Sequence, residues 1–139
     1  MKISKPTKGE EIRCLLDYFA KCHDASLRKI CFKKNREFDE NGNLVYPFND
    51  VNESVNCDIE IEMLLNSYTN ARKDQVVLFG FKNVKAFNFM QEEDFDYSDI
   101  YEVKFRATDV GYFNFVFSTK NGEREVLNLY CRNFVSKEI

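Results

Sequence analysis

The residues that could do chemistry in this chain are few, because His23 is the only histidine among 139 residues. Zinc sites with two histidines, facial triads and HExxH helices need at least two imidazoles, so one chain of this sequence does not build them. Asp24 follows His23, and a Ser-His-Asp or Cys-His arrangement assembled in space stays open. No GxSxG sequence supports a serine nucleophile. We predict that His23 is a turn residue between a helix and a strand and that the protein is not an enzyme. The alternative is a small enzyme that uses His23 and Asp24.

The spacing of the cysteines and glycines matches no metal-binding or cofactor-binding motif. No two cysteines have the C-x-x-C spacing of zinc knuckles and redox motifs; the five are Cys14, Cys22, Cys31, Cys57 and Cys131. We expect reduced, structural thiols and therefore a cytoplasmic protein. None of the five glycines belongs to a P-loop or a GxGxxG pattern, and the acidic segment 92–99 lacks EF-hand spacing. No cofactor and no metal is predicted.

The charge is unevenly distributed, although the net value is only −3. Residues 1–36 carry ten basic and four acidic residues, 37–62 carry eight acids and no base, and 92–102 carry six acids and no base. Such asymmetry favours a charge-guided contact with a protein, whereas nucleic acids select clearly basic domains. Tyr97 and Tyr101 border the second acidic run, and rings among acids suit a surface that meets a cationic protein.

We therefore predict a partner-binding surface built from the 92–102 segment and from an acidic row on one strand. Its residues are Glu92, Glu93, Asp94, Asp96, Tyr97, Asp99, Tyr101, Asp58, Glu60 and Glu62. A neighbouring strand is expected to supply Lys or Arg opposite the row; if none does, the row is free to meet a basic partner. The plainer interpretation is that these charges solvate exposed faces and loops.

The first secondary-structure element that the sequence predicts is a helix over residues 7–22. Thr7 and Glu10 fit a capping box, and an apolar stripe then follows at helical spacing, formed by Ile12, Leu15, Leu16 and Phe19. Residues 25–135 form a β-rich region: several of its segments alternate apolar and polar residues, as antiparallel strands do, and residues 75–81 form a near-continuous apolar run. The sequence predicts strands near 27–32, 55–65, 75–81, 84–90, 100–107, 113–117 and 123–134, with a break at Lys82–Asn83.

Loops and length complete the fold prediction. Asn41-Gly42 and Asn121-Gly122 signal tight turns, and a long polar loop is expected near 35–55. No apolar run approaches the roughly 18–20 residues of a membrane span, and no secretory signal is expected. We predict a single α+β domain over 1–139, in which the N-terminal helix packs on a twisted, mostly antiparallel sheet of six or seven strands.

The segment His23-Asp24-Ala25-Ser26-Leu27-Arg28-Lys29-Ile30 resembles the HDxxL(R/K)xI opening of small bacterial domains encoded beside polymorphic and contact-dependent toxins. The segments 100–107, 111–117 and 127–134 are similar in order and spacing. The resemblance implies an immunity protein, a binder that covers the active site of a cognate, basic toxin. We expect a monomer or weak homodimer that binds neither nucleic acid nor membrane. A homo-oligomerising scaffold that pairs an exposed sheet edge is the other alternative.

Overall fold

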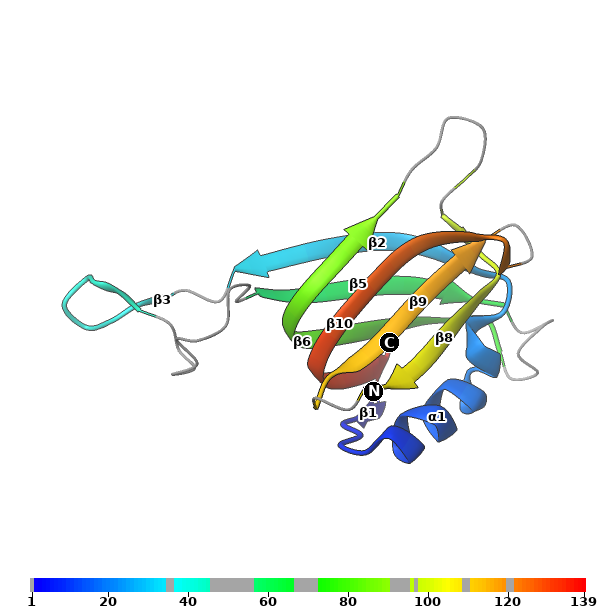
Figure 1. The fold of residues 1–139 in the computed structure, drawn as a ribbon, viewed down its shortest axis with the longest axis horizontal. Coiled ribbons are helices and arrows are strands. Elements are labelled where there is room, and N and C mark those ends of the chain that lie inside the picture. The colour runs from blue at the N-terminus through cyan, green and yellow to red at the C-terminus, as the bar shows by residue number, and fades with distance from the viewer. Residues whose placement is uncertain are drawn as a thin grey trace.

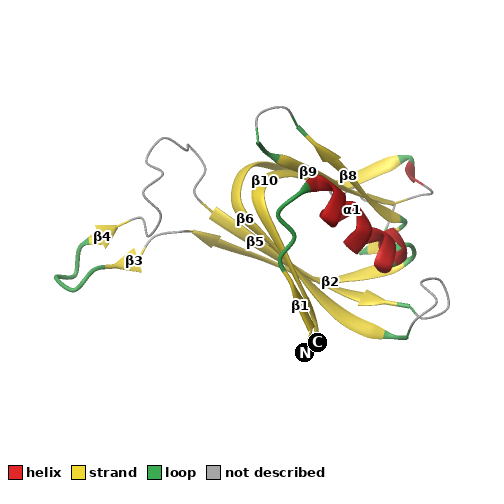
Figure 2. Cartoon of the chain, turned by 90° about the horizontal axis from the view of Figure 1, so that it is seen from below, coloured by secondary structure: helices red, strands yellow, loops and turns green. Residues whose placement is uncertain are grey.

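The computed structural model describes residues 2–34, 37–45, 57–66, 73–90, 96, 98–108, 111–119 and 122–139. In this part of the chain one antiparallel sheet curls into a nearly closed barrel, and a single α-helix lies along its open side (Figures 1 and 2). The elements are β1 (Lys2–Ser4), α1 (Gly9–Tyr18), a short 3-10 turn (Ala20–Cys22), β2 (Ala25–Lys34), β3 (Glu37–Phe38), β4 (Leu44–Val45), β5 (Cys57–Leu65), β6 (Gln75–Phe89), β7 (Asp99–Ile100), β8 (Glu102–Ala107), β9 (Phe113–Thr119) and β10 (Arg124–Glu138).

The sheet order is β7-β2-β5-β6-β10-β9-β8, with β1 added to the end of β10. Every recorded strand pair is antiparallel. The prediction of an α+β fold with a mostly antiparallel sheet is therefore confirmed, although the sheet dominates the described structure and curves into a barrel.

The barrel closes through one continuous segment that belongs to both edges of the sheet. Strands β7 and β8 are consecutive in sequence but lie at opposite ends of the strand order. Ile100 of β7 pairs with Ala25 of β2, and Val103 of β8 pairs with Phe117 of β9. Between them, Tyr101 N–H donates to the Ser118 carbonyl at 2.7 Å, and the Tyr101 carbonyl accepts from Asp24 N–H at 3.2 Å. We call this region, residues 98–103 with the start of β2, the closed end.

A β-bulge bends the sheet where the sequence predicts a break. β6 is one continuous strand, so the expected interruption at Lys82–Asn83 is wrong. Against β5, Cys57 pairs with Val84 and Ile59 with Phe81, so two residues of β6 face Asp58 alone. Asn83 takes a φ of +53°, a left-handed conformation that Asn tolerates better than most residues. The residue that breaks the apolar run thus bends the strand without ending it.

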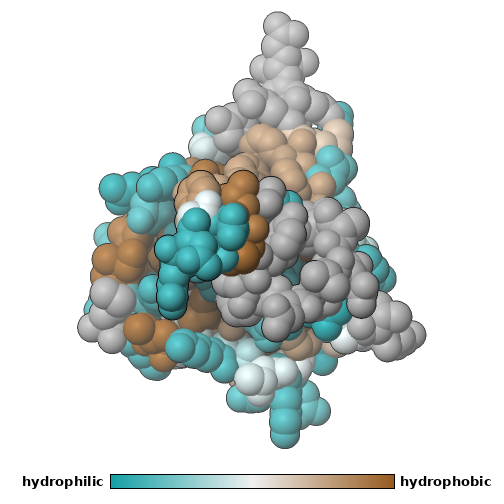
Figure 3. Space-filling view, turned by 90° about the vertical axis from the view of Figure 1, so that its left-hand side faces the viewer, coloured by the Kyte–Doolittle hydropathy of each residue, from teal (hydrophilic) through white to brown (hydrophobic). Residues whose placement is uncertain are grey.

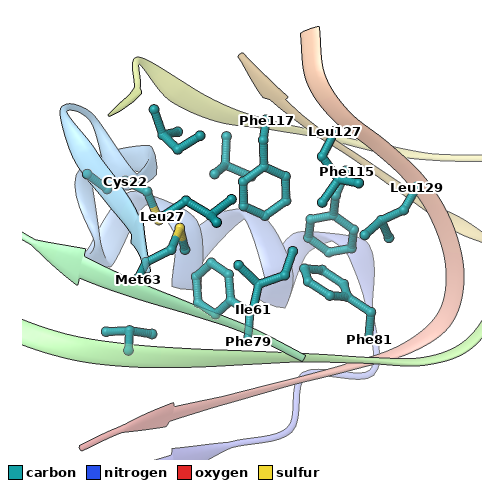
Figure 4. Close-up of a cluster of buried hydrophobic side chains, with 14 of the residues drawn as sticks. Cys22, Leu27, Ile61, Met63, Phe79, Phe81, Phe115, Phe117, Leu127 and Leu129 are labelled. Carbon is teal, nitrogen blue, oxygen red and sulfur yellow. The ribbon is translucent and has the colours of Figure 1, made fainter. Parts of the chain in front are cut away.

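The core is rich in phenylalanine. Figure 4 shows Phe79, Phe81, Phe115 and Phe117 converging between the facing walls of the sheet, and all four side chains are fully buried. The Phe81 ring centroid lies 4.9 Å from that of Phe115. On the predicted 55–65 strand, Ile59, Ile61, Met63 and Leu65 point into the core and are between 0% and 3% exposed, whereas Cys57 at the start of β5 is only partly buried.

Helix α1 packs on the core through the expected stripe but starts differently. Ile12, Leu16 and Phe19 are buried, and the Phe19 ring centroid lies 5.9 Å from that of Phe79. The helix begins at Gly9 with Lys8 at the N-cap and no side-chain cap, so the predicted capping box is wrong. Because the helix starts beyond Thr7, the Thr7 hydroxyl instead donates to a Glu11 carboxylate oxygen at 3.3 Å.

The predicted loop near 35–55 contains a two-stranded hairpin, β3 and β4, whose tip lies at one extreme of the described structure (Figures 1 and 2). Asp39 accepts hydrogen bonds from the backbone of Asn41 at 2.9 Å and Asn43 at 2.8 Å, and Gly42 has a φ of +81°. The tight turn predicted at Asn41-Gly42 is therefore confirmed. Residues 46–56 of that loop lie outside the described residues.

Candidate functional site

The predicted partner-binding surface divides into two groups. Asp99 and Tyr101 are described and lie at the closed end of the barrel, and Asp96, also described, is hydrogen-bonded to Ser98 of that region. The row of Asp58, Glu60 and Glu62 lies on the outer face of β5. The other members of the 92–102 group lie outside the described residues; these are Glu92, Glu93, Asp94 and Tyr97.

Strand pairing and a local turn place the carboxylates of the closed end. Asp99 is exposed and pairs with Ser26 at the start of β2, which brings it to the same edge as Asp24. Asp96 accepts hydrogen bonds from the Ser98 backbone N–H at 2.9 Å and the Ser98 hydroxyl at 2.6 Å. These bonds favour the charged form and hold the pKa of Asp96 below its ordinary value. Asp96 therefore keeps its negative charge to a lower pH than an ordinary aspartate.

An aromatic pair lies beside these carboxylates. The His23 and Tyr101 ring centroids are 4.7 Å apart, with the rings edge to face. His23 Nδ1 lies 3.3 Å from Asp24 Oδ2, and the two side chains are 39% and 53% exposed. His23 and Asp24, which were considered above as catalytic residues of a small enzyme, thus lie next to Tyr101 at the rim of the closed end.

A hollow of about 470 Å³ opens on the outer face of the sheet at this end. Leu64 and Val76 form an apolar floor, and Asp24 and Asp74 supply carboxylates. The register explains the grouping, because Ser26 pairs with Leu64 and Leu64 with Val76. Sequence reasoning did not assign Asp24 and Asp74 to this surface. The sequence could have indicated this grouping, because Asp24 directly precedes β2 and Asp74 directly precedes β6, and these two strands start at the same end of the sheet.

The acidic row of β5 is compensated by the chain itself. Asp58 is only 6% exposed; its carboxylate lies 3.4 Å from Lys82 Nζ and accepts from Asn83 N–H at 3.0 Å. Glu62 lies 3.2 Å from Arg28 Nε. The expectation that a neighbouring strand supplies basic residues opposite the row is therefore confirmed.

Glu60, the middle residue of the row, is exposed and borders a second hollow of about 420 Å³. Lys5, Lys82 and Lys137 also line this hollow. Its surroundings are thus mainly basic, unlike those of Asp96 and Asp99.

The described residues offer no metal cluster. Within them, no group of three or more His, Cys, Asp or Glu side chains is placed to hold a metal ion. All five cysteines are described as free thiols; Cys22 and Cys131 are buried, whereas Cys14 and Cys31 are exposed. None of the helices in the described part of the chain combines the length and apolarity that crossing a membrane requires.

The geometry defines a small, sheet-dominated α+β fold with acidic and aromatic side chains at the closed end of its barrel. Comparison of the chain with protein-family models, with curated proteins and with solved structures found no match.

Proposed function

We propose that the chain is a non-catalytic, cytoplasmic binding protein of the immunity type, which neutralises a cognate bacterial toxin by docking its closed end on a cationic surface of that toxin. The observation that carries the proposal is that Asp24 lies beside Tyr101 and lines the outer hollow together with Asp74, while Asp99 and the Ser98-bonded Asp96 lie on the adjoining edge. These side chains come from three separate parts of the sequence, near residues 24, 74 and 96–101.

The hollow supports a cationic occupant through its shape and chemistry. Lys and Arg side chains have an apolar stem and a charged head. Leu64, which is 41% exposed, and Val76 would pack on the stem, while Asp24 and Asp74 would receive the head. Among the described residues, no ion pair with Lys or Arg is recorded at Asp96 or Asp99, so their charges act outward.

The two kinds of contact have different energetic roles. Exposed carboxylates raise the association rate of a cationic partner more than they add to equilibrium affinity. Half-buried rings such as Tyr101 and partly exposed apolar side chains such as Leu64 supply the desolvated contacts that slow dissociation. The closed end combines both.

The test uses the protein encoded by the adjacent gene, co-expressed with this chain, with stopped-flow association at several salt concentrations as the readout. Asp96→Lys combined with Asp99→Lys is expected to slow association by about tenfold or more and to flatten its salt dependence. Glu10→Lys with Asp17→Lys changes the net charge equally on exposed positions of α1 and serves as the control.

Equal rates for the two double variants would discard the closed end as the binding surface. Failure of the wild-type chain to bind its neighbour's product, or to protect cells that express it, would discard the immunity function itself.

A further inference from the structure

The β3–β4 hairpin is a projecting arm whose apolar side chains are exposed. We call residues 37–45 the arm. Phe38 pairs with Leu44 across the hairpin, so the two share one face, and they are 73% and 50% exposed. A two-stranded hairpin is at best marginally stable in water by itself and gains stability when its apolar face is covered. The arm is therefore suited to lying on another surface.

The hydrophobic core reaches the surface at the end of the barrel from which the arm extends. Phe32 of β2 pairs with the fully buried Ile59, and Phe87 of β6 pairs with the fully buried Leu129, so both rings point to the core side of the sheet. The two ring centroids are 4.9 Å apart, yet the residues remain 51% and 43% exposed. Figure 3 looks onto this end, where hydrophobic and hydrophilic residues lie side by side. We call Phe32, Phe87 and the adjoining Lys33 and Lys34 the base.

The arm and the base carry opposite charges. The arm contains Glu37, Asp39 and Glu40 and no basic residue, and all three acids are exposed. The base ends in Lys33, which follows Phe32 on the outer face opposite Asp58, and in Lys34; both are exposed. One chain thus presents an acidic apolar element and a basic apolar surface of comparable character. Such self-complementarity is what a two-fold symmetric interface requires.

We propose that two copies of this chain form a symmetric dimer in which the arm of each copy lies on the base of the other. Phe38 and Leu44 would cover Phe32 and Phe87, and the net negative charge of the arm would face the net positive charge of the base. The arm and the closed end lie at opposite extremes of the barrel (Figure 1), so dimerisation leaves the proposed toxin-binding surface accessible. The proposal is independent of the toxin-binding function.

The first experiment measures the solution mass of the full chain by sedimentation velocity across the micromolar range. The wild-type chain is expected to reach twice the monomer mass, and Phe38→Asp to weaken dimerisation by at least about tenfold. Ile139→Asp is the matched control, because Ile139 is also an exposed apolar residue, at 61%, but lies outside the arm and the base. It should dimerise as the wild type does. Circular dichroism checks that each variant is folded.

The second experiment tests which surfaces meet. Glu37→Lys with Glu40→Lys makes the arm basic, and Lys33→Glu with Lys34→Glu makes the base acidic. Each variant alone then has an arm and a base of the same sign and is expected to stay monomeric. When the two are mixed, both arm–base contacts become complementary, and a heterodimer is expected.

A monomeric wild-type chain throughout the concentration range would overturn the proposal and leave the arm to a different partner. A dimer that Phe38→Asp does not weaken would place the interface elsewhere and also overturn it. A mixture that remains monomeric would refute the arm-to-base arrangement.

Discussion

Asp58 Oδ1 accepts a 3.0 Å hydrogen bond from the backbone N–H of Asn83, the left-handed residue of the β6 bulge. The other carboxylate oxygen of Asp58 lies 3.4 Å from Lys82 Nζ, so one nearly buried side chain contacts both bulged residues. The bend of the sheet therefore depends on an acid that the sequence pattern assigns to the partner-binding row.

Asp58→Ala is expected to lower the free energy of unfolding by about 2 kcal/mol, because it leaves a bulge N–H and a half-buried lysine without this acceptor. Urea denaturation of the variant and the wild type measures the difference. Glu60→Ala removes an exposed acid from the same face of β5 and should change stability by less than about 0.5 kcal/mol. Similar losses for the two variants would contradict the structural role of Asp58.

Gly80 of β6 pairs with Val135 of β10, whose side chain occupies the space beside the glycine. A Cβ atom at this position would lie 2.6 Å from Val135 Cγ1. We expect Gly80→Ala to destabilise the protein by about 1–3 kcal/mol through overpacking. Val135→Ala in the same chain should recover part of this loss, which a double-mutant cycle measures.

Gly9→Ala provides the control for that substitution, since the nearest atom to its added Cβ is Ala107 Cβ at 3.5 Å, an ordinary contact. It should not destabilise the protein. Additive effects of the Gly80 and Val135 substitutions would show that the two side chains do not meet as described.

The buried thiols predict a loss of stability at alkaline pH. Burial raises the pKa of Cys22 above its ordinary value of 9.0, and burial does the same to Cys131. Above that pH the unfolded chain releases thiol protons that the folded chain retains, so the free energy of unfolding falls as pH rises. The expected slope is at most about 1.4 kcal/mol per pH unit for each thiol.

Cys22→Ala should make that alkaline slope shallower, whereas Cys14→Ala, at an exposed position, should leave it unchanged. Urea denaturation at a series of pH values provides the measurement. An identical slope for Cys22→Ala and the wild type would be evidence against a protonated, buried Cys22.

The lowered pKa of Asp96 depends first on the Ser98 hydroxyl and then on the Ser98 backbone N–H. Ser98→Ala removes the hydroxyl donor, so the pKa of Asp96 is expected to rise toward its ordinary value of 3.8. Ser98→Thr keeps a hydroxyl and should hold the pKa low. Carboxyl carbon NMR titration reads the pKa directly, and no difference between the Ala and Thr variants would disprove this assignment.

Periodicity predicts much of this fold because burial of one face leaves a direct trace in the sequence. The alternation at Ile59, Ile61 and Met63 and the helical stripe at Ile12 and Leu16 both identify core positions correctly. Closure of the barrel was not predictable in the same way. It depends on backbone hydrogen bonds of Tyr101 to two distant strands, and backbone pairing leaves no residue-type signature.

The candidate site shows the same division between local and tertiary information. The acidic character of Asp99 and Asp74 is visible in the sequence, whereas the strand order places Asp99 at the same edge as Asp24 and brings Asp24 and Asp74 to one hollow. Asp58 and Glu62 follow the outward pattern correctly, yet their charges are compensated by Lys82 and Arg28. The alternation of apolar and polar residues predicts the face of the sheet on which a side chain lies, but it does not predict which charged residue pairs with that side chain.

The outer edge of strand β2 is paired with another strand near its start and unpaired along the rest of its length in the described structure. In the described structure β7 pairs with the outer edge of β2 only at Ala25 and Ser26, and the remainder of that edge extends past the end of β7. This stretch carries Arg28, Lys29, Lys33 and Lys34. Like charges along an open strand edge discourage a second molecule from continuing the sheet and starting an aggregate. The same lysines that would attract an acidic arm therefore protect the molecule against uncontrolled polymerisation.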